Sequence, residues 1–132
     1  MSYATRTDLE ERYGADELVQ RESVLPAGAV DRALADADVE IDSYLATRYT
    51  VPLSPVPGNA VRIAAAIARY RLLGDAVTEI ARKDYEDSRA WLKDVAAGRV
   101  QINGATPLAA AAPSASVDYV VGRDNAFTGG IQ

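Results

Sequence analysis

The feature that most constrains this chain is a long amphipathic segment that a cluster of prolines ends. Between Val30 and Tyr49, apolar residues recur at steps of three and four, which is the spacing of one face of an α-helix. Six positions define this stripe: Val30, Leu34, Ala37, Ile41, Tyr44 and Leu45. The acidic residues between them fall mostly off the stripe, so we expect them to face water. Pro52, Pro55 and Pro57 prevent the helix from continuing. The sequence therefore predicts one helix of about 30 Å, with the other elements packed on its apolar face.

Two short helices are predicted before this segment. Thr5 followed three positions later by Asp8 resembles a capping box, and Gly14 suits the residue just past the end of the first helix. A second short helix is expected to run from Asp16, as its N-terminal cap, through Gln20.

Two longer helices are predicted after the prolines. The first follows Asn59, a suitable N-cap, and ends at Gly74. It is alanine-rich and apolar around most of its circumference, which is typical of a helix in the middle of a bundle. The second is capped by Asp75 or Thr78, shows the amphipathic spacing and ends near Gly98.

The last part of the chain has a different character. Arg99–Ile102 alternates polar and apolar residues and indicates a short strand, and residues 105–116 have the alanine, proline and serine composition of a spacer. The remaining residues, which include Tyr119 and Phe127, either pack on the bundle or form an arm that orders on a neighbouring subunit. The predicted fold is all-α: a small bundle of about four main helices with short N-terminal helices, a short strand near 99–102 and an extended C-terminal arm. This divides the chain into a helical domain, 1–98, and a C-terminal part, 99–132.

The residue types limit the chemistry available to the chain. It contains no cysteine and no histidine, which removes the thiolate nucleophile, the commonest general base and the commonest metal ligand. Asp38 with Asp42, and Asp36 with Glu40, place acids one turn apart, but a cation site needs more ligands than such a pair supplies. The glycines are mostly single residues at helix ends and form no phosphate-binding loop. We therefore expect no catalytic residue, no cofactor and no bound metal.

The charge distribution argues against ordinary DNA binding. The net charge is −5, and the first 48 residues carry eleven acids against five bases. Residues 49–98 carry six acids and seven bases, so no basic stripe is available to contact phosphates. The polar N-terminus and the lack of a long apolar run predict neither a signal peptide nor a membrane span. We expect a soluble protein that is used inside a cell.

An apolar loop is a candidate contact surface. The segment after the long helix is apolar and contains Tyr49, Val51, Pro52 and Leu53. A small bundle that acts alone has no obvious need for an apolar loop. The loop either staples the two flanking helices together or contacts another protein.

Two arginines are a second candidate. Arg62 and Arg69 lie seven residues apart, hence on one side of their helix. They either pair with acids of the long helix, as exposed arginines commonly do, or pair with the acidic face of a neighbouring subunit. With the aromatic residue of the arm, the candidate partner or subunit contacts are Tyr49, Pro52, Leu53, Arg62, Arg69 and Phe127.

Five stretches of residues 1–100, taken in order, resemble one family. They are the opening MSYAT with DLEERYG, the helix ALADADVEIDSYLATRY, the linker VPLSPVP, the segment IARYRLL, and KDYEDSRAWLKDVAAGRV. Together they are similar to the Mu-like tailed-phage proteins long catalogued as a phage domain of unknown function. Eight residues match the family pattern as fold-defining positions: Asp42, Tyr44, Arg48, Tyr49, Pro52, Pro55, Tyr85 and Trp91. The tail departs from the pattern, since only Arg123 and Phe127 suggest the basic, aromatic ending of other members.

The resemblance implies a head–tail connector, that is, a neck or head-completion subunit of the virion. Such a protein is expected to form a homo-oligomeric ring between the portal and a tail or stopper protein, in the host cytoplasm during assembly and afterwards in the virion. DNA would only pass through the channel, without sequence-specific binding, and no membrane would be involved. Acidic residues such as Asp36, Asp38 and Asp42 would then repel the passing DNA. The alternative is a monomeric helical adaptor or regulatory protein that binds one partner through the Tyr49–Leu53 loop.

Overall fold

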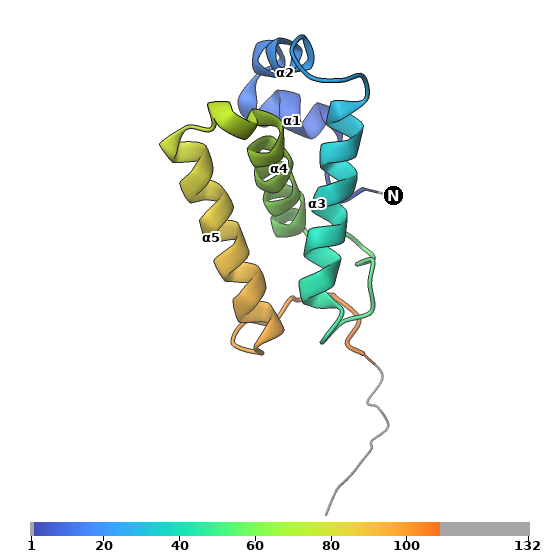
Figure 1. Ribbon diagram of the computed structural model, residues 1–132. Coiled ribbons are helices and arrows are strands. Elements are labelled where there is room, and N and C mark those ends of the chain that lie inside the picture. Colours follow the sequence, from blue (N-terminus) through green and yellow to red (C-terminus); the bar gives the residue numbers. More distant parts are fainter. Residues whose placement is uncertain (1, 109–132) are drawn as a thin grey trace, which may run out of the picture.

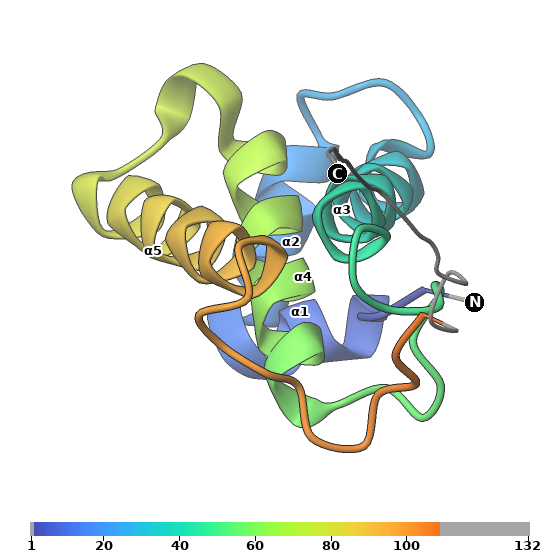
Figure 2. The ribbon, with the colours of Figure 1, turned by 90° about the horizontal axis from the view of Figure 1, so that it is seen from below.

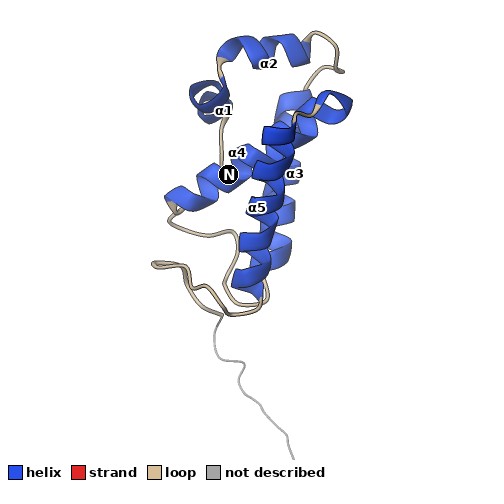
Figure 3. Ribbon diagram, turned by 90° about the vertical axis from the view of Figure 1, so that its left-hand side faces the viewer, coloured by secondary structure: helices blue, strands red, loops and turns tan. Residues whose placement is uncertain are grey.

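Residues 2–108 are described by the computed structural model, and their regular structure is helical. The elements are α1 (Arg6–Tyr13), α2 (Ala15–Glu22), α3 (Ala29–Leu45), α4 (Gly58–Leu73), the 3₁₀ turn η1 (Gly74–Ala76) and α5 (Glu79–Ala96). The three long helices α3, α4 and α5 form a bundle, and α1 and α2 lie across one end of it (Figures 1 and 3). The predicted all-α class is confirmed.

Helix α4 is the centre of the bundle because its side chains are small. It packs against α3, α5 and α1. Nine of its residues are buried: Ala60, Ile63, Ala64, Ala65, Ala66, Ile67, Ala68, Leu72 and Leu73. The helix begins at Gly58, two residues earlier than predicted, because Pro57 and not Asn59 occupies the N-cap position. Instead the Asn59 Oδ1 accepts a hydrogen bond from Arg62 Nε at 3.0 Å.

The apolar stripe of α3 is buried as predicted, but the helix ends at Leu45, four residues earlier than expected. Val30, Ala37 and Ile41 are almost completely enclosed, whereas Tyr44 at the edge of the stripe is only half-buried. After Leu45 the chain enters a turn, in which the Leu45 carbonyl accepts the N–H groups of the third and fourth residues that follow. The helix ends there because the turn brings the next segment back onto the bundle.

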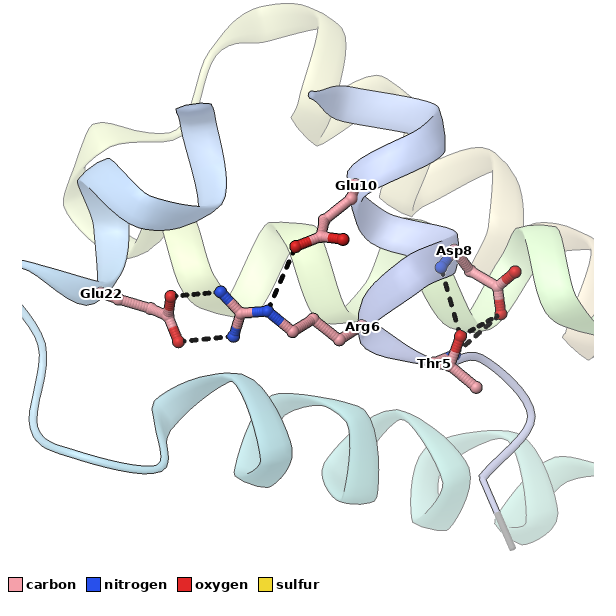
Figure 4. Close-up of polar contacts among 5 residues, drawn as sticks. All are labelled: Thr5, Arg6, Asp8, Glu10 and Glu22. Carbon is pink, nitrogen blue, oxygen red and sulfur yellow. Dashed lines mark hydrogen bonds and ion pairs between the residues drawn. The ribbon is translucent and has the colours of Figure 1, made fainter. Parts of the chain in front are cut away.

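Helices α1 and α2 are joined by one arginine. The predicted capping box forms: Thr5 Oγ1 accepts the Asp8 N–H at 3.2 Å, and the Asp8 carboxylate accepts the Thr5 N–H at 2.8 Å. Arg6 reaches from α1 to the Glu22 carboxylate with two hydrogen bonds of 2.7 and 2.6 Å, and contacts Glu10 at 3.3 Å (Figure 4). These bonds lower the pKa of Glu22.

The boundaries of α2 differ from their prediction, whereas the cap of α5 is one of the two residues predicted for it. Helix α2 begins at Ala15, so Gly14 is its N-cap rather than Asp16, and its end at Glu22 lies beyond the predicted Gln20. Helix α5 is capped by Thr78, whose side chain accepts the N–H of Ala81.

The predicted strand at Arg99–Ile102 is wrong for the residues that the structure describes. After α5 the chain turns at Gly98, where φ is +82°, and returns as an irregular segment in which Ile102 is buried. This segment meets the chain that follows α3 through a single antiparallel bridge between Tyr49 and Pro107. The two segments do not extend this bridge into a sheet, because only a few of their residues lie alongside one another (Figure 2).

Candidate interaction surface

Three irregular segments are linked to one another and to the C-terminal half of α3 by hydrogen bonds. They are the N-terminal residues 2–5, the proline loop (residues 46–57) and the C-terminal segment (residues 97–108), and we call this region the loop end. The proline loop and the C-terminal segment lie together at the lower end of the bundle in Figure 1. The peptide bonds before Pro52 and Pro55 are cis.

Tyr3 ties the N-terminal residues to both α3 and the proline loop. Its N–H donates to Asp38 Oδ1 at 2.9 Å, and its hydroxyl donates to Asp42. The same hydroxyl accepts the N–H of Leu53 at 2.9 Å. Burial, reinforced by the hydrogen bond to Asp42, raises the pKa of Tyr3 well above its ordinary value. Asp38 and Asp42 are therefore half-buried partners of this tyrosine, and the expectation that they face water is wrong.

Tyr49 ties the proline loop to the C-terminal segment. Its side chain is 7 % exposed, and its hydroxyl accepts the N–H of Ile102 at 2.9 Å. On either side of it, the Thr50 N–H donates to the Thr106 carbonyl at 2.9 Å and the Leu108 N–H donates to the Arg48 carbonyl at 3.0 Å. The Tyr49 side chain thus fastens the proline loop to the segment that follows α5, and not to the second helix that flanks the loop.

Arg48 links the proline loop to the C-terminal end of α5. Its Nε donates to the Ala96 carbonyl at 3.1 Å, and its guanidinium lies directly over Gly98. A side-chain Cβ at Gly98 would come within 2.6 Å of Arg48 Nη2, which is the end of a flexible side chain and can move, so it is the positive φ of +82° that favours glycine at this position.

The exposed part of the loop end is an open apolar pocket. We call it the proline pocket; it measures about 410 Å³ and is lined by Tyr3, Pro52, Leu53, Ser54, Pro55 and Val56. Leu53 is 3 % exposed and belongs to the core, whereas Pro52 and Pro55 are exposed. Of the three loop residues predicted as contacts, Tyr49 and Leu53 are thus enclosed by the chain itself, and Pro52 presents surface.

The two predicted arginines lie on α4 away from the acids of α3. Arg69 makes two hydrogen bonds to Glu17 of α2, at 2.9 and 3.0 Å, and its guanidinium lies 4.3 Å from the ring centroid of Tyr13. The bonds to Glu17 raise the pKa of Arg69. Arg62 contacts Asp84 of α5 at 3.9 Å.

The arginine that does pair with α3 is Arg71. Its guanidinium is 3.0 Å from Glu40 and 4.0 Å from Asp36. Arg71 lies two residues beyond Arg69, about 200° further around the helix, and this offset turns it towards α3. Sequence reasoning missed this pair, although the helical offset from Arg69 was a usable signal.

A tyrosine pair joins α4 to α5, and one of its members also reaches α3. The rings of Tyr70 and Tyr85 are stacked, with centroids 4.0 Å apart and an interplanar angle of 5°. The Tyr85 hydroxyl donates to Glu40 Oε2 at 3.1 Å. Burial and the neighbouring Glu40 raise the pKa of Tyr85. Glu40 is thus held between Arg71 and Tyr85.

Three acidic side chains of α3 are held by partners within the described part of the chain. Within residues 2–108, no group of three acidic side chains is placed to hold a metal ion, and none of the helices is long and apolar enough to cross a membrane. The carboxylates of Asp38, Asp42 and Glu40 are occupied by tyrosine and arginine partners. Phe127, the sixth predicted contact residue, lies outside the described residues.

Comparison with known proteins gives consistent matches. A family model described as "Bacteriophage Mu, Gp36" matches residues 3–120. The Mu-like prophage FluMu protein gp36 of Haemophilus influenzae is 40% identical over 105 residues, which cover 76% of this chain and 74% of that protein. Gene product J of Escherichia phage Mu is 37% identical over 105 residues, covering 75% of this chain and 74% of that protein. Neither the family description nor these names indicate a catalytic function.

Proposed function

The chain belongs to the bacteriophage Mu Gp36 family, and on this premise we propose that it is a structural subunit of the virion neck. In this role it is a head-completion protein that joins head to tail as a ring beneath the portal. It is present in the host cytoplasm during assembly and in the virion afterwards. The proposal is supported by the phage and prophage origin of its relatives and by the head–tail connector role that the sequence resemblance implies.

The observation that carries the proposal is the construction of the loop end. Tyr3 and Tyr49 fix three irregular segments to a rigid bundle, and the proline pocket is left open on the outside. Such an arrangement holds a binding surface in one shape without providing a nucleophile or base for catalysis. Rigid elements with an open apolar surface suit repeated protein–protein contact.

A ring requires that one face of a subunit meet a different face of the next. Such heterologous contacts close when the rotation between subunits allows it. The portal contacts one side of the ring and a tail or stopper protein contacts the other.

DNA passes through the channel of this ring without sequence-specific contact. Because Asp38 and Asp42 are engaged by Tyr3, the exposed acids of α3 that remain for such a lining are Asp31 and Asp36. Their negative charge would keep the passing duplex from adhering. In phage carrying Asp31→Asn and Asp36→Asn together, we expect slower DNA ejection, measured by dye uptake in vitro. An unchanged ejection rate would contradict the proposal that these acids line the channel.

The neck role is tested by deleting the gene from the phage or prophage that encodes it. Electron microscopy of the lysate is expected to show heads and complete tails that are not joined, and supplying the protein from a plasmid should restore joined particles. Joined, infectious particles without the protein would contradict the proposal, and so would a loss of heads or of tails alone.

A monomeric adaptor is the second candidate, because Pro52 and the proline pocket could seat one partner protein. Its contact loop has less surface to offer than the sequence suggests, since Tyr49 and Leu53 are buried. A lack of self-association, with or without a portal, would favour this candidate.

A further inference from the structure

The proline pocket is an open, mostly apolar hollow in the surface of the loop end. Its volume of about 410 Å³ falls within the range of about 300–1,000 Å³ that is typical of binding sites. Its walls come from Tyr3 and the loop Pro52–Val56, and the hydrogen bond between Leu53 and the Tyr3 hydroxyl fixes one wall against the other. The site is therefore formed before anything binds to it.

The sequence contains a segment with the chemistry to fill such a site. Beyond Leu108 the chain continues for 24 residues, 109 to 132. Residues 117–127 hold a group of large apolar side chains: Val117, Tyr119, Val120, Val121 and Phe127. An aromatic side chain of this size buries about 150–250 Å² when it docks in an apolar pocket.

The direction of the chain at its last described residues points away from its own pocket. The bridge between Tyr49 and Pro107 is antiparallel, and Leu108 is bonded to Arg48 while Thr106 is bonded to Thr50. At Leu108 the chain therefore heads towards the end of α3, whereas the pocket lies on the other side of Thr50. The nine residues from Leu108 to Val117 span at most about 30 Å, so a segment that starts at Val117 can lie well beyond the surface of its own bundle.

We infer that residues 117–127 of one copy dock in the proline pocket of a second copy of this chain. The contact runs from the C-terminus of one subunit to the loop end of the next, so it is heterologous and can repeat around a closed ring. The inference rests on the proposed ring and names the segment and the site that link its subunits. Because a tether raises the local concentration of the docking segment, each link adds to the contacts between the bundles.

Single cysteines test this inference, since the natural chain has none. Two separately purified full-length variants, Ser54→Cys in the pocket wall and Val120→Cys in the docking segment, are mixed and oxidised. The matched control replaces the first variant by Ser23→Cys, an exposed serine that follows α2 at the other end of the bundle. Peptide mass spectrometry then quantifies the disulfides between unlike chains.

The expected result is at least about tenfold more disulfide between the S54C and V120C chains than between the chains of the control mixture, because docking raises the local concentration of the two thiols. An equal yield in both mixtures would overturn the inference. So would a double variant, S54C with V120C, that closes its disulfide within one chain, because the segment would then occupy its own pocket.

The experiments distinguish a failure of the docked segment from a failure of the proposed neck function. A chain ending at Leu108 that still forms a complete ring with the portal, together with no enrichment of the disulfide, would leave the neck role standing and reject the docked segment. Enriched disulfide without any closed ring would support the contact between copies and reject the ring.

Discussion

At the scale of single residues, two tyrosine hydroxyls organise the loop end. Tyr3 and Tyr49 each accept a backbone N–H from a segment about 50 residues away, Leu53 and Ile102 respectively. Nearly every residue carries a backbone N–H donor, so residue types do not indicate which donor a tyrosine hydroxyl will bind, and these bonds could not be predicted. The apolar character of its loop singles out Tyr49 in the sequence, whereas no comparable signal marks Tyr3.

The first prediction concerns Tyr3. Replacing Tyr3 by phenylalanine keeps the buried ring but removes the hydroxyl, which leaves the Leu53 N–H and the Asp42 carboxylate without this partner. We expect the free energy of unfolding in urea to fall by about 1–3 kcal/mol. The control is Tyr13→Phe, since the half-buried Tyr13 makes its contact to Arg69 through the ring. Equal stability of Y3F and the natural protein would show that the hydroxyl does not hold the loop end.

The second prediction is a loss of stability in alkali. Burial raises the pKa of Tyr3, Tyr13 and Tyr85 above the ordinary value of 10.0. Below pH 10 these groups are protonated in the folded and the unfolded chain, so their contribution to stability is complete. Above it, the unfolded chain loses its protons first, and the free energy of unfolding falls as the pH rises.

Urea titrations between about pH 8 and pH 11 measure this fall. Because Y3F lacks one of the three shifted groups, its free energy of unfolding should decline less steeply than that of the natural protein. Parallel declines in the two proteins would contradict the assigned shift at Tyr3.

At the scale of elements, the helices were predictable where their own residues determine them. The stripe of α3, the alanine-rich centre α4 and the cap of α5 at Thr78 follow from spacing and capping rules. The end of α3 at Leu45 and the irregular path of 99–102 depend on contacts with distant segments, which periodicity does not contain. The candidate surface was predictable as a loop, but residue types alone do not tell which loop residues are buried.

The third prediction tests how α2 is held to the bundle. Arg69 of α4 makes two bonds to Glu17 and lies over the ring of Tyr13, with only 19% of its side chain exposed. Replacing Arg69 by alanine should lower the free energy of unfolding by about 1–3 kcal/mol, since a partly buried pair and a cation–π contact are lost together. Arg69→Lys should recover only part of this, because lysine cannot make the two parallel bonds.

The matched control is an arginine at the surface of α5. Arg82 pairs with Glu79, whose side chain is 87% exposed, so Arg82→Ala should change the stability by less than about 0.5 kcal/mol. If R69A and R82A have equal effects in urea titrations, the Arg69 contacts do not secure α2.

At the scale of the whole molecule, the arrangement separates a rigid body from a surface for contact. The bundle and its α1–α2 cap are held by buried apolar side chains and by arginine pairs, whereas the loop end carries the open proline pocket. Membership of the Gp36 family places the chain among phage and prophage proteins. In the proposed neck subunit, the rigid body would set the shape and the loop end would make the contact with a neighbouring subunit.

The central claim is self-assembly into a ring, and native mass spectrometry of the full-length protein measures it most directly. The protein is measured over a concentration series, alone and with the portal of the same phage. We predict one discrete large species, a closed ring with a fixed number of subunits, in at least the samples that contain the portal. A monomer at every concentration, with and without the portal, would contradict the account.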